Sequence, residues 1–249
     1  MSEKEKDELM IDCCLLAGKL MIESGAETYR VEDTMSRMAS TRNMAHVNSY
    51  VTPTGIFFSA GNEKQTRVIR INSRTTDLEK IALMNLLSRK LSAGELTLDE
   101  VFAELQTISK TNYMFPVSVQ VLAAAVASAC FLILFGGGWG DLPSAFIAGG
   151  AGLAIQLLIH EKTQVKFFSE FIASMLIGVL AMLSVGLGFG TDLDVIIIGS
   201  VMPLVPGLLL TNAVRDLMAG NFIAGLSKGA EALLTAFAIG AGIGLILSL

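Results

Sequence analysis

The chain has 249 residues, of which 52% are hydrophobic, and its mean hydropathy is +0.60. These values are too high for soluble domains of this length and indicate a membrane protein. The formal net charge is −5 and no basic stripe is visible, which argues against nucleic-acid binding. Charge is also uneven, since residues 1–115 hold 14 of the 18 Lys+Arg and 16 of the 23 Asp+Glu. Because charge is costly inside a bilayer, we predict a water-soluble domain over 1–115 and a membrane domain over 116–249.

The first 115 residues predict a small α+β domain. Apolar residues at helical spacing and β-branched runs predict four helices and two strands: helices 5–24, 26–39, 76–92 and 97–109, and strands 46–60 and 65–71. Gly25 is placed to end the first helix, and Gly61-Asn62 occupies a hairpin-turn position. Thr97 and Glu100 have the spacing of a capping box, which predicts the start of the last helix.

The remaining residues predict a helical bundle of about five membrane spans. Long apolar runs separate the candidate spans, and a mixed segment at 212–228 precedes the last: 116–135, 143–159, 167–188, 194–211 and 229–249. Basic residues lie in two connections and favour the cytoplasmic side: Lys162, Lys166, Arg215 and Lys228. The sequence therefore predicts a multi-pass protein of the cell (inner or plasma) membrane with residues 1–115 inside and the C-terminus outside.

The fourth span is interrupted by Pro203 and by Pro206-Gly207. Each proline removes a backbone donor and crowds the preceding turn, and the freed carbonyls must face protein or a water-filled cavity. Broken helices of this type build substrate and ion sites in secondary transporters. Three polar residues follow within about two turns and complete the main candidate set: Asn212, Arg215 and Asp216. The alternative is a proline kink followed by an ordinary cytoplasmic helix start.

Further carboxylates lie in or near the membrane domain. Asp141 follows a glycine-rich loop and is a candidate for the substrate path. Glu231 is a secondary candidate, although Lys228 three residues earlier can pair with it on a helix. Glu170 is near enough to the cytoplasmic edge to reach water. Carboxylates partly removed from water can carry protons, so the position of each decides its role.

A polar cluster opens the second helix of the soluble domain, with Glu27, Arg30 and Glu32 as secondary candidates. Carboxylates at the positive end of a helix have a sufficient structural explanation. A ligand or interdomain contact at the same cluster is the alternative interpretation.

No catalytic constellation is visible, and no enzyme activity, metal or cofactor is expected. His46 and His160 lie in different halves of the chain, which makes a metal site or a histidine-based triad improbable. The sequence has no phosphate-binding P-loop, so direct ATP drive is not supported. A membrane hydrolase is the weakest hypothesis, because the spacing of its Ser, His and acidic residues suggests no site.

Motifs in both halves resemble one family in order along the chain: Ser24-Gly-Ala-Glu-Thr-Tyr-Arg-Val-Glu-Asp-Thr34, Tyr50-Val-Thr-Pro-Thr-Gly-Ile-Phe57, Arg70 with Asp77-Leu78, the Gly136–Asp141 loop, and Leu204-Val-Pro-Gly207 through Asn212, Arg215 and Asp216 to Gly220-Asn221. With these segments the chain resembles the threonine/serine exporter family of membrane proteins. The resemblance implies a cytoplasmic domain followed by about five spans. It implies export of small hydrophilic metabolites, threonine and serine in some members and dicarboxylates such as succinate in others, driven by the proton-motive force.

The same resemblance implies a partner. Fused members carry a second membrane module, so this chain resembles the larger subunit of a split pair whose smaller subunit is a separate multi-span protein. Self-association is an alternative source of the second module. Membrane lipid and a small-molecule substrate are the other expected partners. The competing hypothesis is a membrane-tethered metabolite-sensing or regulatory protein with no transport of its own, based on the polar cluster at residues 27–33.

Overall fold

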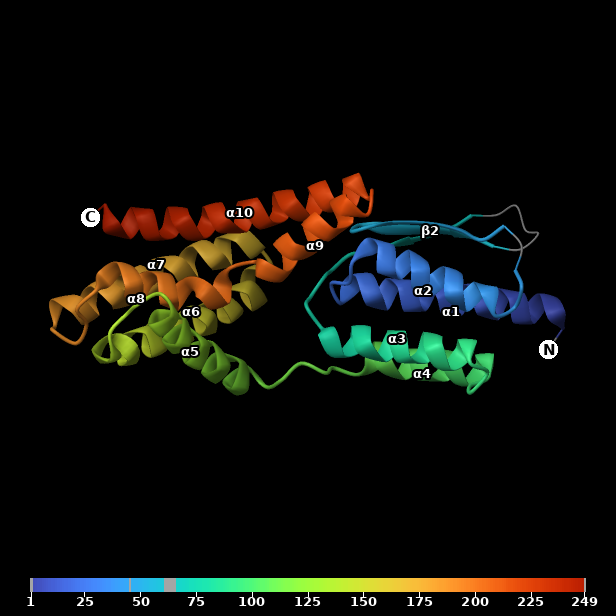
Figure 1. Ribbon diagram of the computed structural model, residues 1–249, viewed down its shortest axis with the longest axis horizontal. Coiled ribbons are helices and arrows are strands. Elements are labelled where there is room, and N and C mark those ends of the chain that lie inside the picture. Colours follow the sequence, from blue (N-terminus) through green and yellow to red (C-terminus); the bar gives the residue numbers. More distant parts are fainter. Residues whose placement is uncertain (1, 45, 61–65, 249) are drawn as a thin grey trace. The chain divides into compact units, whose positions relative to one another are not determined.

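The computed structural model of the chain describes residues 2–44, 46–60 and 66–248. They divide into two compact units (Figure 1). Unit 1 comprises Met1–Met114 together with Leu208–Gly229, and unit 2 comprises Phe115–Gly207 together with Ala230–Leu249. Unit 1 therefore combines the amino-terminal part of the chain with a segment from near its end.

The described residues of the amino-terminal part of unit 1 form a three-stranded antiparallel sheet in the order β1-β2-β3 and four helices. Figure 1 shows α1 and α2 between the sheet and the α3–α4 pair, in agreement with their contacts. The elements are β1 (Asn48–Thr52), β2 (Gly55–Ser59), β3 (Arg67–Arg70), α1 (Glu3–Glu23), α2 (Thr28–Ser40), α3 (Leu78–Ser92) and α4 (Leu98–Lys110). A single apolar core joins one face of the sheet to both helix layers.

Two local signals in unit 1 are confirmed. Gly25 has a φ of +89° just after α1, and the Ala26 N–H returns to the Met21 carbonyl, which is the αL helix ending that glycine favours. Thr97 and Glu100 form the predicted capping box of α4. The strand predicted over 46–60 is wrong as one element, because the chain reverses at Pro53-Thr54 and makes β1 and β2. Gly61-Asn62 lies outside the described residues.

The apolar half of the chain forms long helices. Their bounds are α5 (Val117–Leu134), the 3₁₀ turn η1 (Trp139–Asp141), α6 (Leu142–Thr163), α7 (Lys166–Gly186), α8 (Leu193–Val201), the 3₁₀ turn η2 (Met202–Leu204), α9 (Gly207–Met218) and α10 (Phe222–Leu247). Among the described residues, four helices are long and apolar enough to span a membrane. A fifth candidate is a pair, Leu193–Leu204 with Gly207–Met218, bent by 61°.

The prediction of about five spans agrees with these four helices and the bent pair. The bend falls at the predicted prolines. The helix that carries the last predicted span begins earlier than that span. Residues 212–218 belong to α9, and α10 begins at Phe222 rather than at residue 229. In unit 2, α5, α6, α7 and α8 pack on one another around a core of small and aliphatic side chains. Gly199 permits close packing there, since a Cβ would meet the Leu132 backbone at 2.9 Å.

Candidate functional site

Two segments about 190 positions apart in sequence meet inside unit 1. One is the turn from α1 into α2, and the other is formed by α9 and the first residues of α10. We call their junction the α2–α9 cluster, and its side chains come from Glu27, Thr28, Asn212, Arg215, Asp216 and Lys228. The two segments that the sequence marked as separate candidates therefore form one site.

Asp216 lies at the centre of the cluster and is fully buried. Its carboxylate accepts hydrogen bonds from the Thr28 backbone N–H at 2.9 Å and from the Thr28 hydroxyl at 3.0 Å. Lys228 donates to the same carboxylate at 2.7 Å and is itself only 4% exposed. The Asp216 charge thus caps the positive N-terminal end of α2 and neutralises a buried ammonium group.

Side chains of α9 and α10 also bind the backbone of the turn before α2. The Asn212 amide donates to the Gly25 carbonyl at 2.9 Å, and Lys228 donates to the Ala26 carbonyl at 3.0 Å. Both donors are buried. Because these carbonyls follow the end of α1, their bonds fix the turn that leads into α2 and hold it against α9.

Glu27 provides the outer part of the cluster. Arg215 donates to one of its carboxylate oxygens at 2.6 Å and Arg30 to the other at 3.2 Å. Burial raises the pKa of Glu27, but its own backbone N–H and the two guanidinium groups outweigh burial and hold that pKa below the ordinary value. Glu27 is the N-cap residue of α2 but makes no side-chain capping hydrogen bond, so its carboxylate is held mainly by the two arginines.

Glu32 lies one turn further along α2 and is half-buried. Its carboxylate accepts from the Val51 backbone N–H of β1 at 3.0 Å. Burial raises the pKa of Glu32, the Val51 bond opposes that shift, and the negative charge of Asp216 adds to it. Glu32 therefore links α2 to the sheet while experiencing the field of the α2–α9 cluster.

The other predicted candidates lie elsewhere. Pro203, Pro206 and Gly207 belong to unit 2, where Pro203 lies in η2 and α9 begins at Gly207. Asp141 is also in unit 2, 1% exposed, and accepts from the backbone N–H of Thr191 at 2.6 Å and from its hydroxyl at 2.9 Å. Glu231 lies in the part of α10 that belongs to unit 2.

Thr28 and Lys228 are functional candidates that the sequence reasoning missed. The sequence did contain a signal for Lys228, because Gly220 lies between it and Asp216, twelve residues earlier. In the structure Gly220 has a φ of +86°. Such a turn between α9 and α10 folds the second helix back toward the first. Gly225 permits the close approach, because a Cβ there would meet the Ala213 carbonyl oxygen at 2.9 Å. Thr28 carried no comparable signal, since its partner lies 188 positions away.

The charges of the α2–α9 cluster suit binding and movement rather than metal chemistry. Among the described residues, no group of three or more His, Cys, Asp and Glu side chains could hold a metal ion. The long apolar helices and the bent pair fit a multi-pass membrane protein, and a bent pair of this kind is typical of transporters.

Comparison with known proteins defines the family. The family described as "Putative threonine/serine exporter" (ThrE) matches residues 12–249, and the chain belongs to that family. It is therefore a membrane transport protein and not an enzyme. No solved structure matches the chain.

Curated relatives cover nearly the whole chain. The "Probable succinate transporter subunit YjjP" of Escherichia coli is 25% identical over 251 residues, which span 99% of this chain and 97% of that protein. The protein of the same name from Klebsiella aerogenes is 24% identical over 97% of this chain and 94% of its own length. A Schizosaccharomyces pombe protein, C7D4.12c, is 23% identical over 81% of this chain but only 28% of its own length.

Proposed function

We propose that this chain is one subunit of a secondary exporter that moves small hydrophilic metabolites, threonine and serine or a dicarboxylate, out of the cell. Membership of the threonine/serine exporter family supports export, and the relatives named as succinate transporter subunits support a dicarboxylate. The word subunit in those names supports a second, smaller membrane protein as partner. In this proposal residues 1–115 are cytoplasmic, the C-terminus is outside, and the proton-motive force drives transport.

One observation carries the mechanism that we propose. Asp216 is a fully buried carboxylate in the second half of the bent pair, and its three bonds reach α2 and α10. Protonation of Asp216 would remove the charge that holds Lys228 and would weaken the cap on α2. In this proposal a proton on Asp216 favours a rearranged cluster. In that way a proton gradient would act on α9, the second half of the bent pair.

The remaining cluster residues have supporting roles in the proposal. Asn212 and Lys228 hold the turn before α2, and the Arg215–Glu27–Arg30 ion pairs hold its outer edge. The bend at Pro203, Pro206 and Gly207 interrupts the helix, and broken helices of this type build solute sites in secondary transporters. Asp141 already has two donors from Thr191, which supports a structural role for it at that loop.

The proposal is tested with the full chain in proteoliposomes, prepared alone and as the complex that purifies from its native membranes. Labelled threonine, serine and succinate are loaded, and their efflux is followed with and without a pH gradient. We expect saturable efflux of at least one solute by the complex, stimulated by the gradient and abolished by a protonophore. Efflux of all three at the rate of empty liposomes would contradict the proposal.

A further inference from the structure

Three exposed apolar side chains form a row across the outer face of the sheet in unit 1. Tyr50 of β1 pairs with Phe57 of β2, and Phe57 pairs with Val68 of β3, so all three project from the same face. Their exposed fractions are 49%, 43% and 61%, and the rings of Tyr50 and Phe57 lie 6.2 Å apart. The opposite face is buried in the core of unit 1. An exposed aromatic row of this kind marks an interaction surface.

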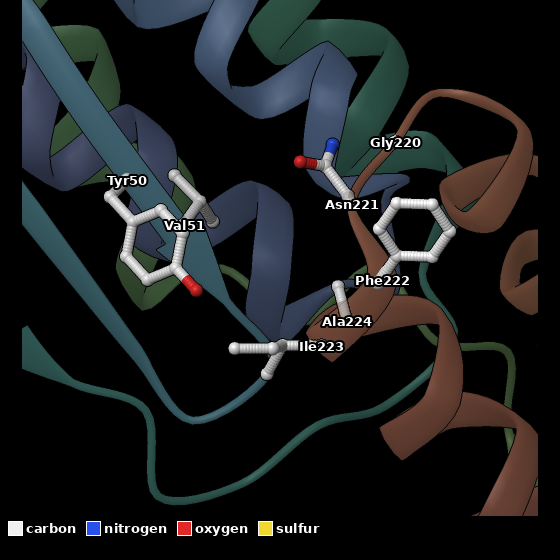
Figure 2. A pocket seen from close by; sticks show the side chains of 7 residues that line it. All are labelled: Tyr50, Val51, Gly220, Asn221, Phe222, Ile223 and Ala224. Carbon is white, nitrogen blue, oxygen red and sulfur yellow. The ribbon is translucent and has the colours of Figure 1, made fainter.

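The row adjoins the start of a candidate membrane helix. A pocket with a volume of about 240 Å³ is lined by Tyr50 and Val51 of β1 and by residues 220–224, which end the α9–α10 turn and begin α10. Figure 2 shows the Tyr50 ring beside Ile223, with Phe222 on the far side of the turn. Phe222 and Ile223 are each 63% exposed, so the apolar surface continues from the sheet onto α10.

The length of α10 fixes the depth of this surface. The helix has 26 residues, and about 20 suffice to cross the hydrocarbon. Counted back from Leu247, the first six residues, 222–227, extend about 9 Å beyond the hydrocarbon at 1.5 Å per residue. The headgroup region on each side of a bilayer is about 5–7 Å thick. The α10 residues that line the pocket with Tyr50, 222–224, therefore lie about 5–9 Å beyond the hydrocarbon, at the outer edge of the headgroup layer.

The chemistry of the row fits that layer. Tyrosine combines an apolar ring with a polar hydroxyl and is enriched where membrane and water meet. Arg70 is exposed, two positions beyond Val68 and thus on the same face of the sheet, where its guanidinium can reach lipid phosphates. We propose that the outer face of the sheet, formed by Tyr50, Phe57, Val68 and Arg70, docks against the headgroup layer of the membrane beside the start of α10. This inference does not depend on the solute or on proton coupling.

The docking surface is tested by placing a single fluorophore on it. Trp139 is the only tryptophan of the chain, so in a Trp139→Phe background all indole emission comes from the tryptophan of Phe57→Trp. The full chain is reconstituted in phosphatidylcholine vesicles, with acyl chains either unmodified or brominated close to the headgroup. Bromine quenches an indole only at short range. We expect Phe57→Trp to lose at least half of its emission in the brominated vesicles and to be shielded from aqueous acrylamide.

A matched control lies on the far layer of unit 1. Leu86 of α3 is 47% exposed, and Leu86→Trp in the same background should be unaffected by bromine and strongly quenched by acrylamide. Tyr50→Trp gives a second probe on the docking surface, with the same expected result as Phe57→Trp. Slow thiol labelling of the buried Cys13 and Cys14 reports that each variant is folded.

Two outcomes would overturn the proposal. Quenching of Phe57→Trp by acrylamide and not by bromine would show that the sheet face is in water. Protection from both quenchers would show that protein covers it, either a partner subunit or another part of this chain. Either result leaves the transport proposal standing, because that proposal depends on flux.

Discussion

Unit 1 and unit 2 each bury one aspartate that accepts hydrogen bonds from the backbone N–H and the hydroxyl of a single threonine. In unit 2, Asp141 binds Thr191, 50 positions away. In unit 1, Asp216 binds Thr28, 188 positions away, and also binds Lys228. Within the described part of the chain, no Lys or Arg pairs with Asp141.

The difference separates a carboxylate that only accepts hydrogen bonds from one that also balances a buried positive charge. Asp141 accepts hydrogen bonds from two donors in one loop that would otherwise bind water, which accounts for its burial. Asp216 does the same for Thr28 but also balances a buried ammonium group, so its charge matters as well as its lone pairs. Loss of charge at Asp216 must therefore affect α2, α9 and α10 together, whereas loss of charge at Asp141 affects one loop.

The largest expected effect comes from leaving the buried carboxylate of Asp216 in unit 1 without its cation. Lys228→Met leaves Asp216 buried without its cation, and unit 1 should lose about 3–5 kcal/mol of unfolding free energy. Burial raises the pKa of the Cys13 thiol to about 12, so this thiol reacts only when unit 1 opens. In a Cys130→Ala background, labelling of the two remaining cysteines should accelerate about a hundredfold or more.

The double variant Asp216→Asn with Lys228→Met sharpens this result. Both charges are removed, and the asparagine oxygen still accepts from the Thr28 N–H, so most of the lost stability should return. A double variant that labels as fast as Lys228→Met would show that the lysine stabilises unit 1 through packing and not through its charge.

A smaller effect is expected at the second aspartate. Asp141→Ala removes the acceptor for the Thr191 N–H and hydroxyl, which should cost about 1–3 kcal/mol. No cation is stranded, so the loss should stay below that of Lys228→Met. Thermal unfolding in detergent, followed by the fluorescence of Trp139 two residues away, measures it. A loss equal to that of Lys228→Met would erase the distinction between the two aspartates.

Glycines before the two threonines offer a further contrast. Gly25 has a φ of +89°, and a Cβ there would lie 3.2 Å from the Thr75 carbonyl oxygen, so Gly25→Ala should cost about 1–2 kcal/mol. Gly190 has no such backbone requirement, and the closest atom to its added Cβ is the end of the Ile196 side chain, which can move. Gly190→Ala should therefore cost less. Thiol labelling and Trp139 fluorescence compare the two, and equal costs would contradict this account.

The smallest predicted effect concerns acid. Because its folded-state pKa is lowered, Glu27 contributes stability that is present above its ordinary pKa of about 4.5 and is lost as pH falls below that value. Glu27→Gln should therefore lower the stability of unit 1 at pH 7 but flatten its decline toward pH 4. Thiol labelling is slow in acid, so thermal unfolding between pH 4 and 7 is the suitable measurement. Parallel curves for both proteins would refute the assignment.

Local chemistry explains which features the sequence predicted. Gly25 at the end of α1, the capping box at Thr97, and the bend at the prolines each depend on residues within one turn of the chain. The reversal at Pro53-Thr54 was missed because strand propensity continues on both sides of it. The last span was predicted to begin after Lys228 because this residue was assigned to a connection, whereas it lies within α10 and is buried against Asp216.

The sequence predicted residues from both segments of the candidate site but not the contact between the segments. Proline and charge patterns identified Asp216 and Arg215, and the polar run identified Glu27, but no local rule joins them. The cap on α2 comes from a side chain 188 positions away, which depends on tertiary packing and not on helix propensity. Burial of Lys228 likewise follows from the turn at Gly220 and from the close packing of α9 and α10.

The central claim is that the charge of Asp216 couples protons to transport. The direct test compares Asp216→Asn with Asp141→Asn in proteoliposomes that contain the native-membrane complex, with flux expressed per folded protein. We predict that Asp216→Asn lowers gradient-stimulated efflux at least tenfold, whereas Asp141→Asn keeps more than half of it. Unchanged, gradient-driven efflux in Asp216→Asn would remove this carboxylate from the mechanism.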